Sequence, residues 1–585
     1  MTDIRPLRLM LFVLCLSLVV GPAALAQPQV APPFSLPDQP AAEALALELA
    51  GAVRHADSPL PAHDLGPAVI WAALTVSTPD APSKVVWVAA DEVEQVMATR
   101  TQAIGEVPNH AVIRVDVAYG LVRERLIAPE FRTSRSGAVW GLAFDPVALG
   151  IALPAEIEAR QLFDSNGIMD RERWVDYASE RGFDTGALTD ALTFTPLDVY
   201  RFQTVTAVQR SGEEAELLTA KRLSVESLSP DLLRESALLA GDYLARSVRR
   251  DGRFDYQYDA GTGRVSRSYN MLRHAGTTFS MYELEDELPD PRRRAAADQA
   301  LQFALANVGP CVAPVNGSDV ACLIEDDEVK LGGQGLLLLA LAEYTEVTGD
   351  RQYIPTMRAL AEWIVGAQFE DGTWVHIVNT GTGEVRDFES DYYPGEAAFG
   401  LLRLYQLDPD PRWLDTAHRG IEAIIASNAG IGDENIPHDH WLLYALAALH
   451  EVDPERVDYA YVRRLTWIIV QTQHRERVPE SWIGGYYNPP RSTPTATRTE
   501  GLCAVLPILE EDDALIAADV RDAVMAGIAF QLQTQIMPDD TTYLADPARA
   551  LGGFTGELYG YDVRIDYVQH NLSSLLCAAN ALAAG

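Results

Sequence analysis

Two kinds of hydrophobic pattern divide the sequence. Between residues 61 and 225, short runs such as AVIWAALTV (68–76) and VYRFQTVTAV (199–208) are rich in β-branched and aromatic residues and are typical of strands. AEIEARQLF (155–163) has the spacing of a helix. From 227 to 585 the apolar positions recur at helical spacing instead. The pattern therefore predicts a small α+β domain, of unknown role, followed by a helical domain.

Two kinds of helix alternate in the region 227–585. One kind is amphipathic, and the other carries small and apolar residues on nearly every side. The amphipathic helices cover residues 230–248, 291–308, 352–369, 411–427, 455–473 and 516–535, and the apolar ones cover 268–285, 330–347, 392–405, 438–452, 497–509 and 565–582. A helix that is apolar all round must be enclosed by others, whereas an amphipathic one can face water. Six enclosed and six outer helices predict a mainly α fold, an (α/α)6 barrel of six helical hairpins.

The inner helices of such a barrel run the same way, so their N-termini converge on one mouth with unpaired backbone N–H groups. Each apolar stretch begins with polar side chains. The candidate catalytic residues among them are Glu396, Asp566, Glu500, His274 and Tyr393. The candidate substrate-binding residues are Tyr269, Asn270, Arg273, Gln334, Asp391, Tyr392, His438, His440, Trp441, Arg498, Arg564 and His570. One such residue is usually a cap or a structural contact, but six sets at equivalent positions predict a ligand-binding cleft.

The loops that lead to this mouth are rich in glycine and aromatic residues. Residues 249–270 and 369–393 share a DG–x–aromatic sequence followed by Gly-Thr-Gly and Val, which predicts two short strands joined by a turn. ESWIGGYYNPP (480–490) and LGGFTGELYGYD (551–562) precede the last two inner helices. Aromatic faces beside carboxylates, Arg and His suit a polyhydroxylated ring. The predicted ligand is therefore a glycan.

The region 227–585 resembles the six-hairpin glycosidase-like superfamily in its architecture and in the style of its loops. LGGQGLLLLALAEYTEVTGDRQYI (331–354) is similar to the second-hairpin helix of glucuronyl C5-epimerase C-terminal domains and of unsaturated-uronyl hydrolases. The resemblance implies an (α/α)6 barrel that acts on carbohydrates.

Three functions fit these residues. In a glycoside hydrolase, the preferred interpretation, two of Glu396, Glu500 and Asp566 would act across the cleft, with Asp391 and Asp439 in reserve. In a uronate-directed lyase or C5-epimerase, a His or Tyr would take a proton beside a carboxylate held by Arg. A non-catalytic glycan-binding barrel is the third. No cofactor is predicted. No metal site is predicted either, because His438 and His440, two positions apart on a helix, do not point the same way.

The formal net charge of −37 argues against nucleic acid or an anionic membrane as a partner, because both are bound through Lys and Arg. Residues 1–26 resemble an export signal: Arg5 and Arg8 precede an apolar run that ends in Ala24-Leu25-Ala26. We therefore expect a periplasmic or secreted protein, without membrane insertion after signal cleavage. Residues 27–60, rich in Pro and Ala, are predicted to be a linker.

Four cysteines follow the predicted signal. Cys311 and Cys322 flank a loop that contains Gly, Pro and Asn, and in an exported protein a disulfide that closes this loop is predicted. Cys503 and Cys577 lie in apolar helical stretches, where either a disulfide or two buried thiols fit the pattern.

Overall fold

The structure is a computed structural model that describes residues 34–54, 68–78, 81–91, 93–127, 140–164, 167–193, 196–218, 223–311 and 320–584. The predicted signal peptide, residues 1–26, lies outside these ranges. Among the residues described, no helix has the length and the apolar character that crossing a membrane requires.

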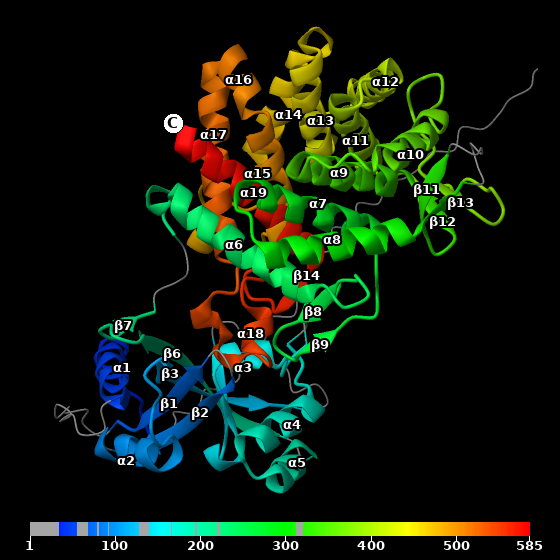
Figure 1. The fold of residues 1–585 in the computed structure, drawn as a ribbon. Helices are drawn as coiled ribbons and strands as arrows, with labels where there is room; N and C mark the ends of the chain where they lie inside the picture. The colour runs from blue at the N-terminus through cyan, green and yellow to red at the C-terminus, as the bar shows by residue number, and fades with distance from the viewer. Residues whose placement is uncertain are drawn as a thin grey trace, which may run out of the picture.

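A seven-stranded antiparallel sheet organises the N-terminal part (Figure 1). The strands follow the order β2-β1-β3-β6-β4-β5, and β7 pairs with β6. Their bounds are β1 Ile70–Thr78, β2 Ala81–Ala90, β3 Val112–Leu126, β4 Gly141–Phe144, β5 Ile151–Ala152, β6 Leu197–Gln209 and β7 Glu216–Leu217. The helices are α1 Gln39–Arg54, α2 Val93–Ala103, α3 Pro154–Ala159, α4 Arg171–Arg181 and α5 Thr185–Thr193. The strand-like runs 68–76 and 199–208 thus form β1 and β6.

The prediction of a linker over residues 27–60 is wrong for the part that forms α1. This helix packs on β3 and β6 and buries Leu45, Leu49 and Val53 in the core of the sheet domain. Its apolar positions recur every three or four residues, a period that the Pro- and Ala-rich composition conceals. The helices α2, α4 and α5 were also not predicted, and the helix expected over 155–163 ends at Ala159.

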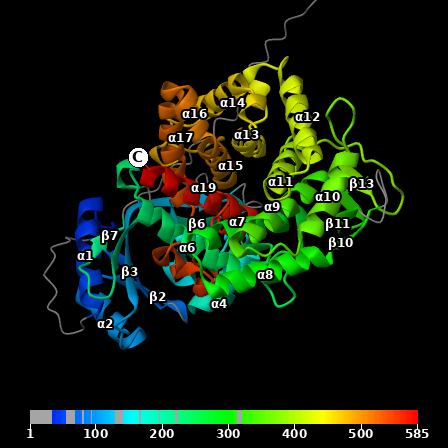
Figure 2. The same ribbon diagram turned by 45° about the horizontal axis from the view of Figure 1, so that its top comes forward.

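The C-terminal part of the described chain is a closed barrel of six inner and six outer helices, which confirms the predicted fold class. The inner helices are α7 Met271–Glu287, α9 Leu331–Thr348, α11 Tyr393–Leu407, α13 His440–Val452, α15 Ser492–Ala504 and α19 Ile565–Ala584. The outer helices are α6 Pro230–Ser247, α8 Pro291–Ala306, α10 Ile354–Gly366, α12 Pro411–Asn428, α14 Tyr459–Thr472 and α17 Ala514–Leu532. Consecutive inner helices pack together, and α19 packs on α7 to close the ring (Figure 2).

One inner helix, α15, begins and ends earlier in the sequence than expected. The apolar stretch 497–509 is divided between α15 and α16 (Leu506–Asp512). Pro507 lies at the junction, where it has no N–H to donate to the carbonyl of residue 503. A short helix, α18 (Pro547–Ala550), follows α17 and lies close to the sheet domain (Figure 1).

Two small sheets join the loops that precede the inner helices. One has the order β14-β8-β9 and the other β10-β11-β12-β13. Their bounds are β8 Gln257–Asp259, β9 Arg264–Val265, β10 Val308–Pro310, β11 Ala321–Glu325, β12 Glu328–Lys330, β13 Ile377–Asn379 and β14 Asp562–Arg564. The predicted strands of 249–270 form β8 and β9. In 369–393, β13 pairs with β12, and Val378 makes a single bridge to Val385.

Both cysteine pairs form disulfides. The predicted bond between Cys311 and Cys322 is confirmed, although residues 312–319 of its loop lie outside the described ranges. The second bond joins Cys503 of α15 to Cys577 of α19, so the alternative of two free thiols is excluded.

Candidate functional site

A cavity of about 380 Å³ opens at the N-terminal end of the inner helices. Eleven of the residues that the sequence predicts as site residues line it: Asn270, Arg273, Tyr392, Tyr393, Glu396, His440, Trp441, Arg498, Arg564, Asp566 and His570. They come from α7, α11, α13, α15 and α19 and from the segments just before these helices. The first turns of the inner helices therefore converge on one cavity, as their common direction requires.

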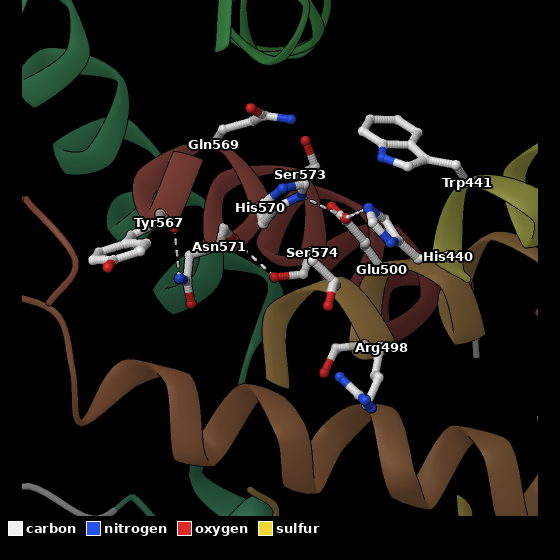
Figure 3. Close-up of polar contacts among 12 residues, drawn as sticks. His440, Trp441, Arg498, Glu500, Tyr567, Gln569, His570, Asn571, Ser573 and Ser574 are labelled. Atoms are coloured by element: carbon white, nitrogen blue, oxygen red, sulfur yellow. Dashed lines mark hydrogen bonds and ion pairs between the residues drawn. The ribbon is translucent and has the colours of Figure 1, made fainter. Parts of the chain in front are cut away.

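Two histidines and a glutamate form a buried cluster at this cavity (Figure 3). His570 Nδ1 lies 2.7 Å from Glu500 Oε1 in a hydrogen bond, and His440 Nε2 lies 3.2 Å from the same oxygen. The two imidazole rings are 5.1 Å apart between centroids. Three different inner helices, α13, α15 and α19, thus bring these groups together, with Glu500 behind the two rings that line the cavity.

The surroundings favour the neutral form of His440. Burial, followed by the electrostatic effect of the neighbouring His570 and Arg498 side chains, lowers the pKa of His440 well below its usual value. Among the described residues, neither ring nitrogen of His440 has a hydrogen-bond partner of acceptable geometry. Burial also raises the pKa of Glu500, although the neighbouring His570 opposes this shift. At neutral pH, His440 is therefore an uncharged imidazole that can accept a proton.

The same cluster could hold a metal ion. His440, Glu500 and His570 each offer one ligand atom, and the three atoms lie within 4.8 Å of one another. Two imidazoles and a carboxylate are a ligand set that Zn²⁺ accepts. In this structure, however, His570 and Glu500 are in direct hydrogen-bond contact, so an ion bound by both would have to replace that bond.

Glu396 is a second buried ionisable group of the cavity. Its side chain is 3 % exposed, and its Oε2 atom has no hydrogen-bond partner among the described residues. A Cβ atom at Gly332 of α9 would lie 1.8 Å from this oxygen, so the close approach of Glu396 to α9 requires a glycine. Burial raises the pKa of Glu396 well above its usual value; the carboxyl of Asp439 adds to the shift and Arg273 opposes it. Burial therefore favours the protonated, neutral form of Glu396.

Asp439 lies next to Glu396 and caps α13. Its Oδ1 atom accepts a hydrogen bond from the backbone N–H of Trp441, at 2.9 Å. Burial raises the pKa of Asp439 to about 8, although the backbone N–H groups of the helix oppose the shift. A capping role and an unusual protonation state are thus combined in one carboxyl group.

Four arginines line the cavity: Arg273, Arg491, Arg498 and Arg564. Arg564 forms a bidentate pair with Asp566, at 2.5 and 2.8 Å, and Arg273 Nε lies 3.0 Å from the same carboxylate. Arg498 donates to His438 Nδ1 at 2.9 Å. Because burial favours the neutral form of Glu396, Asp566 is the lining carboxylate that offsets these charges. The cavity is therefore cationic.

Six of the predicted site residues do not line the cavity. Glu500 lies behind the two histidines, as described. His438 lies behind Arg498, and burial, with the Arg498 charge, lowers the pKa of His438 to about 4. Asp391 is exposed on the segment before α11. The remaining three, Tyr269, His274 and Gln334, make internal contacts.

His274 is a structural residue rather than a base at the cavity. Its Nδ1 is 2.7 Å from the Tyr269 hydroxyl and its Nε2 is 2.8 Å from the Ala300 carbonyl, so both nitrogens are used within the protein. The side-chain amide oxygen of Gln334 accepts a hydrogen bond from the backbone N–H of Leu323, and its amide nitrogen donates to the Leu323 carbonyl. These two bonds connect β11 to α9. These contacts correct the expectation that Tyr269, His274 and Gln334 meet the ligand.

Several lining residues were not among the predicted site residues. They include Leu336, Ser390, Tyr487, Arg491, Thr493, Thr497 and Tyr567. Tyr487 and Arg491 lie in and just after the aromatic loop 480–490, whose composition was the available signal. Arg498 stacks over the rings of Tyr486 and Tyr487, each 5.1 Å from the guanidinium carbon.

Comparisons with known proteins find similarity in structure only: no family model and no curated protein matches the sequence. A D-mannose isomerase aligns with 62 % of this chain and 100 % of its own, at 11 % identity and a TM-score of 0.45. A cellobiose 2-epimerase from Bacillus thermoamylovorans aligns with 60 % of this chain and 99 % of its own, at 13 % identity and a TM-score of 0.46. An unsaturated glucuronyl hydrolase specific for heparin aligns with 60 % of this chain and 98 % of its own, at 12 % identity and a TM-score of 0.42. All three alignments have an identity below 25 % and a TM-score below 0.5.

Proposed function

We propose that the barrel cavity is the active site of a carbohydrate-active enzyme that moves a proton beside the carboxylate of an acidic sugar, as a uronate-directed epimerase or lyase does. The observation that carries this proposal is the neutral imidazole of His440 at a cavity lined by four arginines. The charge of the cavity selects the substrate, and the imidazole supplies the base.

The arginines favour a substrate that brings a negative charge. Asp566 pairs with Arg273 and Arg564, which leaves Arg491 and Arg498 to offset an incoming anion. A guanidinium binds a carboxylate through two parallel hydrogen bonds, which fixes the orientation of the sugar as well as holding its charge. A neutral sugar would leave this positive charge uncompensated. An acidic sugar is therefore the better complement.

In the proposed reaction, His440 takes the proton from the carbon next to the substrate carboxylate. The electrons of the broken C–H bond move into the carboxylate, and arginine stabilises the charge that develops there. In an elimination, the bond from the neighbouring carbon to its oxygen then breaks, and Glu396 gives its proton to the leaving oxygen. In an epimerisation, a proton returns to the first carbon from the opposite face.

Replacing His440 tests the proposal. His440→Ala should lower the turnover of an acidic oligosaccharide by about 10² to 10⁴, the usual contribution of a general base. His450→Ala is the matched control, because His450 lies at the other end of α13, where it contacts Tyr459. Turnover in D₂O, followed by NMR, should put deuterium on the carbon next to the carboxylate for an epimerase, while ultraviolet absorbance should reveal the unsaturated product of a lyase.

A second candidate, a glycoside hydrolase, is favoured by the raised pKa of Glu396. In that reaction Glu396 protonates the leaving oxygen and an ionised carboxylate acts on the other face of the sugar. Reducing ends would then appear without deuterium exchange or unsaturation, and Glu396→Gln would be far more harmful than His440→Ala. Equal activity of wild type and His440→Ala would disprove the proton-abstraction proposal.

A further inference from the structure

A second cavity, of about 540 Å³, lies between the sheet domain and the barrel. The sheet domain lines it with residues of β3, β6 and α3, including Arg114, Tyr119, Gln203, Thr204 and Glu158. The barrel lines it with residues of the loops before and after α18, including Asp540, Tyr543, Thr555, Tyr559 and Tyr561. Figure 1 shows these parts facing each other, with α18 next to α3. Neither domain could form this cavity without the other.

Buried contacts fix the two sides of the cavity relative to each other. The Tyr543 hydroxyl donates to Asp116 Oδ2 at 2.8 Å, and the Arg114 guanidinium carbon lies 5.0 Å from the centre of the Tyr543 ring. Arg114 Nε is also 3.0 Å from Asp116 Oδ2, so its charge is compensated within the protein. The cavity is thus a built feature of the interface, with a wall that combines a tyrosine ring and a neutralised ion pair.

The other lining groups have the chemistry that sugar rings require. Tyr119 and Tyr559 offer aromatic rings, and the Tyr559 side chain is 55 % exposed. The amide of Gln203 and the hydroxyl of Thr204 offer hydrogen-bond donors and acceptors, while the amide nitrogen of Gln533 donates to the Ser481 carbonyl. Aromatic faces stack on the C–H faces of sugars, while amides and hydroxyls pair with the sugar hydroxyls.

The charges of this cavity differ from those of the barrel cavity. Among the residues that line this cavity, Arg114 is the only Lys or Arg, and it is paired with Asp116. No arginine is therefore available here to hold the carboxylate of an anionic sugar. The cavity suits a neutral, hydroxyl-rich sugar instead.

One segment of the chain borders both cavities. Thr555 and Tyr559 line the interdomain cavity, and the same segment continues through β14 to Arg564 of the barrel cavity. It also contacts the first residue of α15, because the backbone N–H of Ser492 donates to the Gly556 carbonyl at 2.9 Å. A ligand in one cavity therefore contacts a segment that also lines the other.

We propose that the interdomain cavity is a second saccharide-binding site, which takes neutral sugar units stacked on Tyr559. The choice of a saccharide rests on the function proposed for the barrel, whereas the site itself rests on its own lining. The sheet domain then has a role: it supplies half of this site.

Calorimetric titration of the mature full-length protein tests this inference. The probes are cellohexaose, mannohexaose and xylohexaose, with hexagalacturonate as the acidic comparison. At least one neutral hexasaccharide should bind, and Tyr559→Ala should raise its Kd about three- to tenfold through the loss of one stacking contact. Gln203→Ala, on the opposite wall, should also raise the Kd. Tyr487→Ala is the matched control, because Tyr487 is an equally exposed tyrosine at the barrel cavity, and it should leave this Kd unchanged.

The outcomes separate this inference from the function of the barrel. A neutral hexasaccharide that binds with the expected variant pattern supports the second site even if no acidic sugar is turned over. If no neutral probe binds, or if Tyr559→Ala and Gln203→Ala both leave the Kd unchanged in proteins whose circular dichroism matches the wild type, the inference is wrong. Loss of binding in Tyr487→Ala alone would assign the saccharide to the barrel cavity.

Discussion

Glu396 and His440 are two buried residues whose neutral forms are favoured by the same physical cause. Burial penalises the charged form of each, so it raises the pKa of the glutamate and lowers that of the histidine. The same cavity therefore favours an acid that keeps its proton and a base that has none. This is the combination that a proton-transfer reaction needs.

The pH dependence of turnover should follow from these two shifts. Activity should fall on the acid side when His440 becomes protonated, and on the alkaline side when Glu396 loses its proton. Ionised Asp439, whose pKa is raised to about 8, makes that loss harder because it repels the Glu396 carboxylate. Asp439→Asn keeps an oxygen that can cap α13 but removes the repulsion, so the alkaline limb of kcat/KM should move to lower pH by about one unit.

The control for this experiment is Asp391→Asn, which removes an exposed carboxylate near Asp439 and should move the limb much less. An alkaline limb that Asp439→Asn leaves in place would mean that Glu396 is not the group that titrates.

The sequence could predict which helix ends carry polar residues but not which way each side chain points. Arg273 and His274 are neighbours at the start of α7, yet Arg273 lines the cavity whereas His274 is buried among protein contacts. Successive helical residues are separated by about 100° around the axis, so the rotation of the helix decides which one faces inward. That rotation depends on packing against all neighbouring helices.

At the scale of elements, the alternation of buried and amphipathic helices was sufficient to predict the barrel. Each inner helix is surrounded by other helices, so it carries small and apolar residues on nearly every side, and this pattern can be seen in the sequence. The helices of the sheet domain were harder to predict because α1 combines Ala-rich composition with a Pro-rich approach, and because α2 has little amphipathic contrast. The core of the sheet domain, which buries α1, is defined by contacts between segments far apart in the sequence.

The disulfide between α15 and α19 joins the two helices that carry Glu500 and His570. It closes a loop of 74 residues, against 11 for the Cys311–Cys322 bond. Closing a longer loop removes more entropy from the unfolded chain. Removing the Cys503–Cys577 disulfide should therefore lower the free energy of unfolding more, by about 4 kcal/mol against about 3 kcal/mol for the Cys311–Cys322 disulfide in the chain-entropy model. The Cys503→Ser/Cys577→Ser pair should therefore be less stable than the Cys311→Ser/Cys322→Ser pair. Urea unfolding without reductant measures the difference, and the reverse order would contradict it.

At the scale of the whole molecule, the net charge and the charge of the barrel cavity have opposite signs. The chain carries a formal charge of −37, while four arginines line the cavity. At low ionic strength the Debye length is about 30 Å, so an approaching acidic sugar is repelled by much of the protein surface. At an ionic strength of about 0.15 M the Debye length is about 8 Å, so only charges near the sugar act on it. Contacts made inside the cavity are screened much less than the long-range repulsion.

Added salt should therefore accelerate the capture of an acidic substrate. Between about 10 mM and about 150 mM NaCl we expect kcat/KM for an acidic oligosaccharide to rise about two- to fivefold, because the long-range repulsion is removed while the arginine contacts persist. Binding of a neutral hexasaccharide should not change over the same range, and it serves as the control. A fall in kcat/KM with salt would mean that the arginines attract the substrate from outside the cavity and outweigh the charge of the surface. Arg498→Gln would then reduce the salt dependence, because Arg498 lines the cavity wall beside Tyr487.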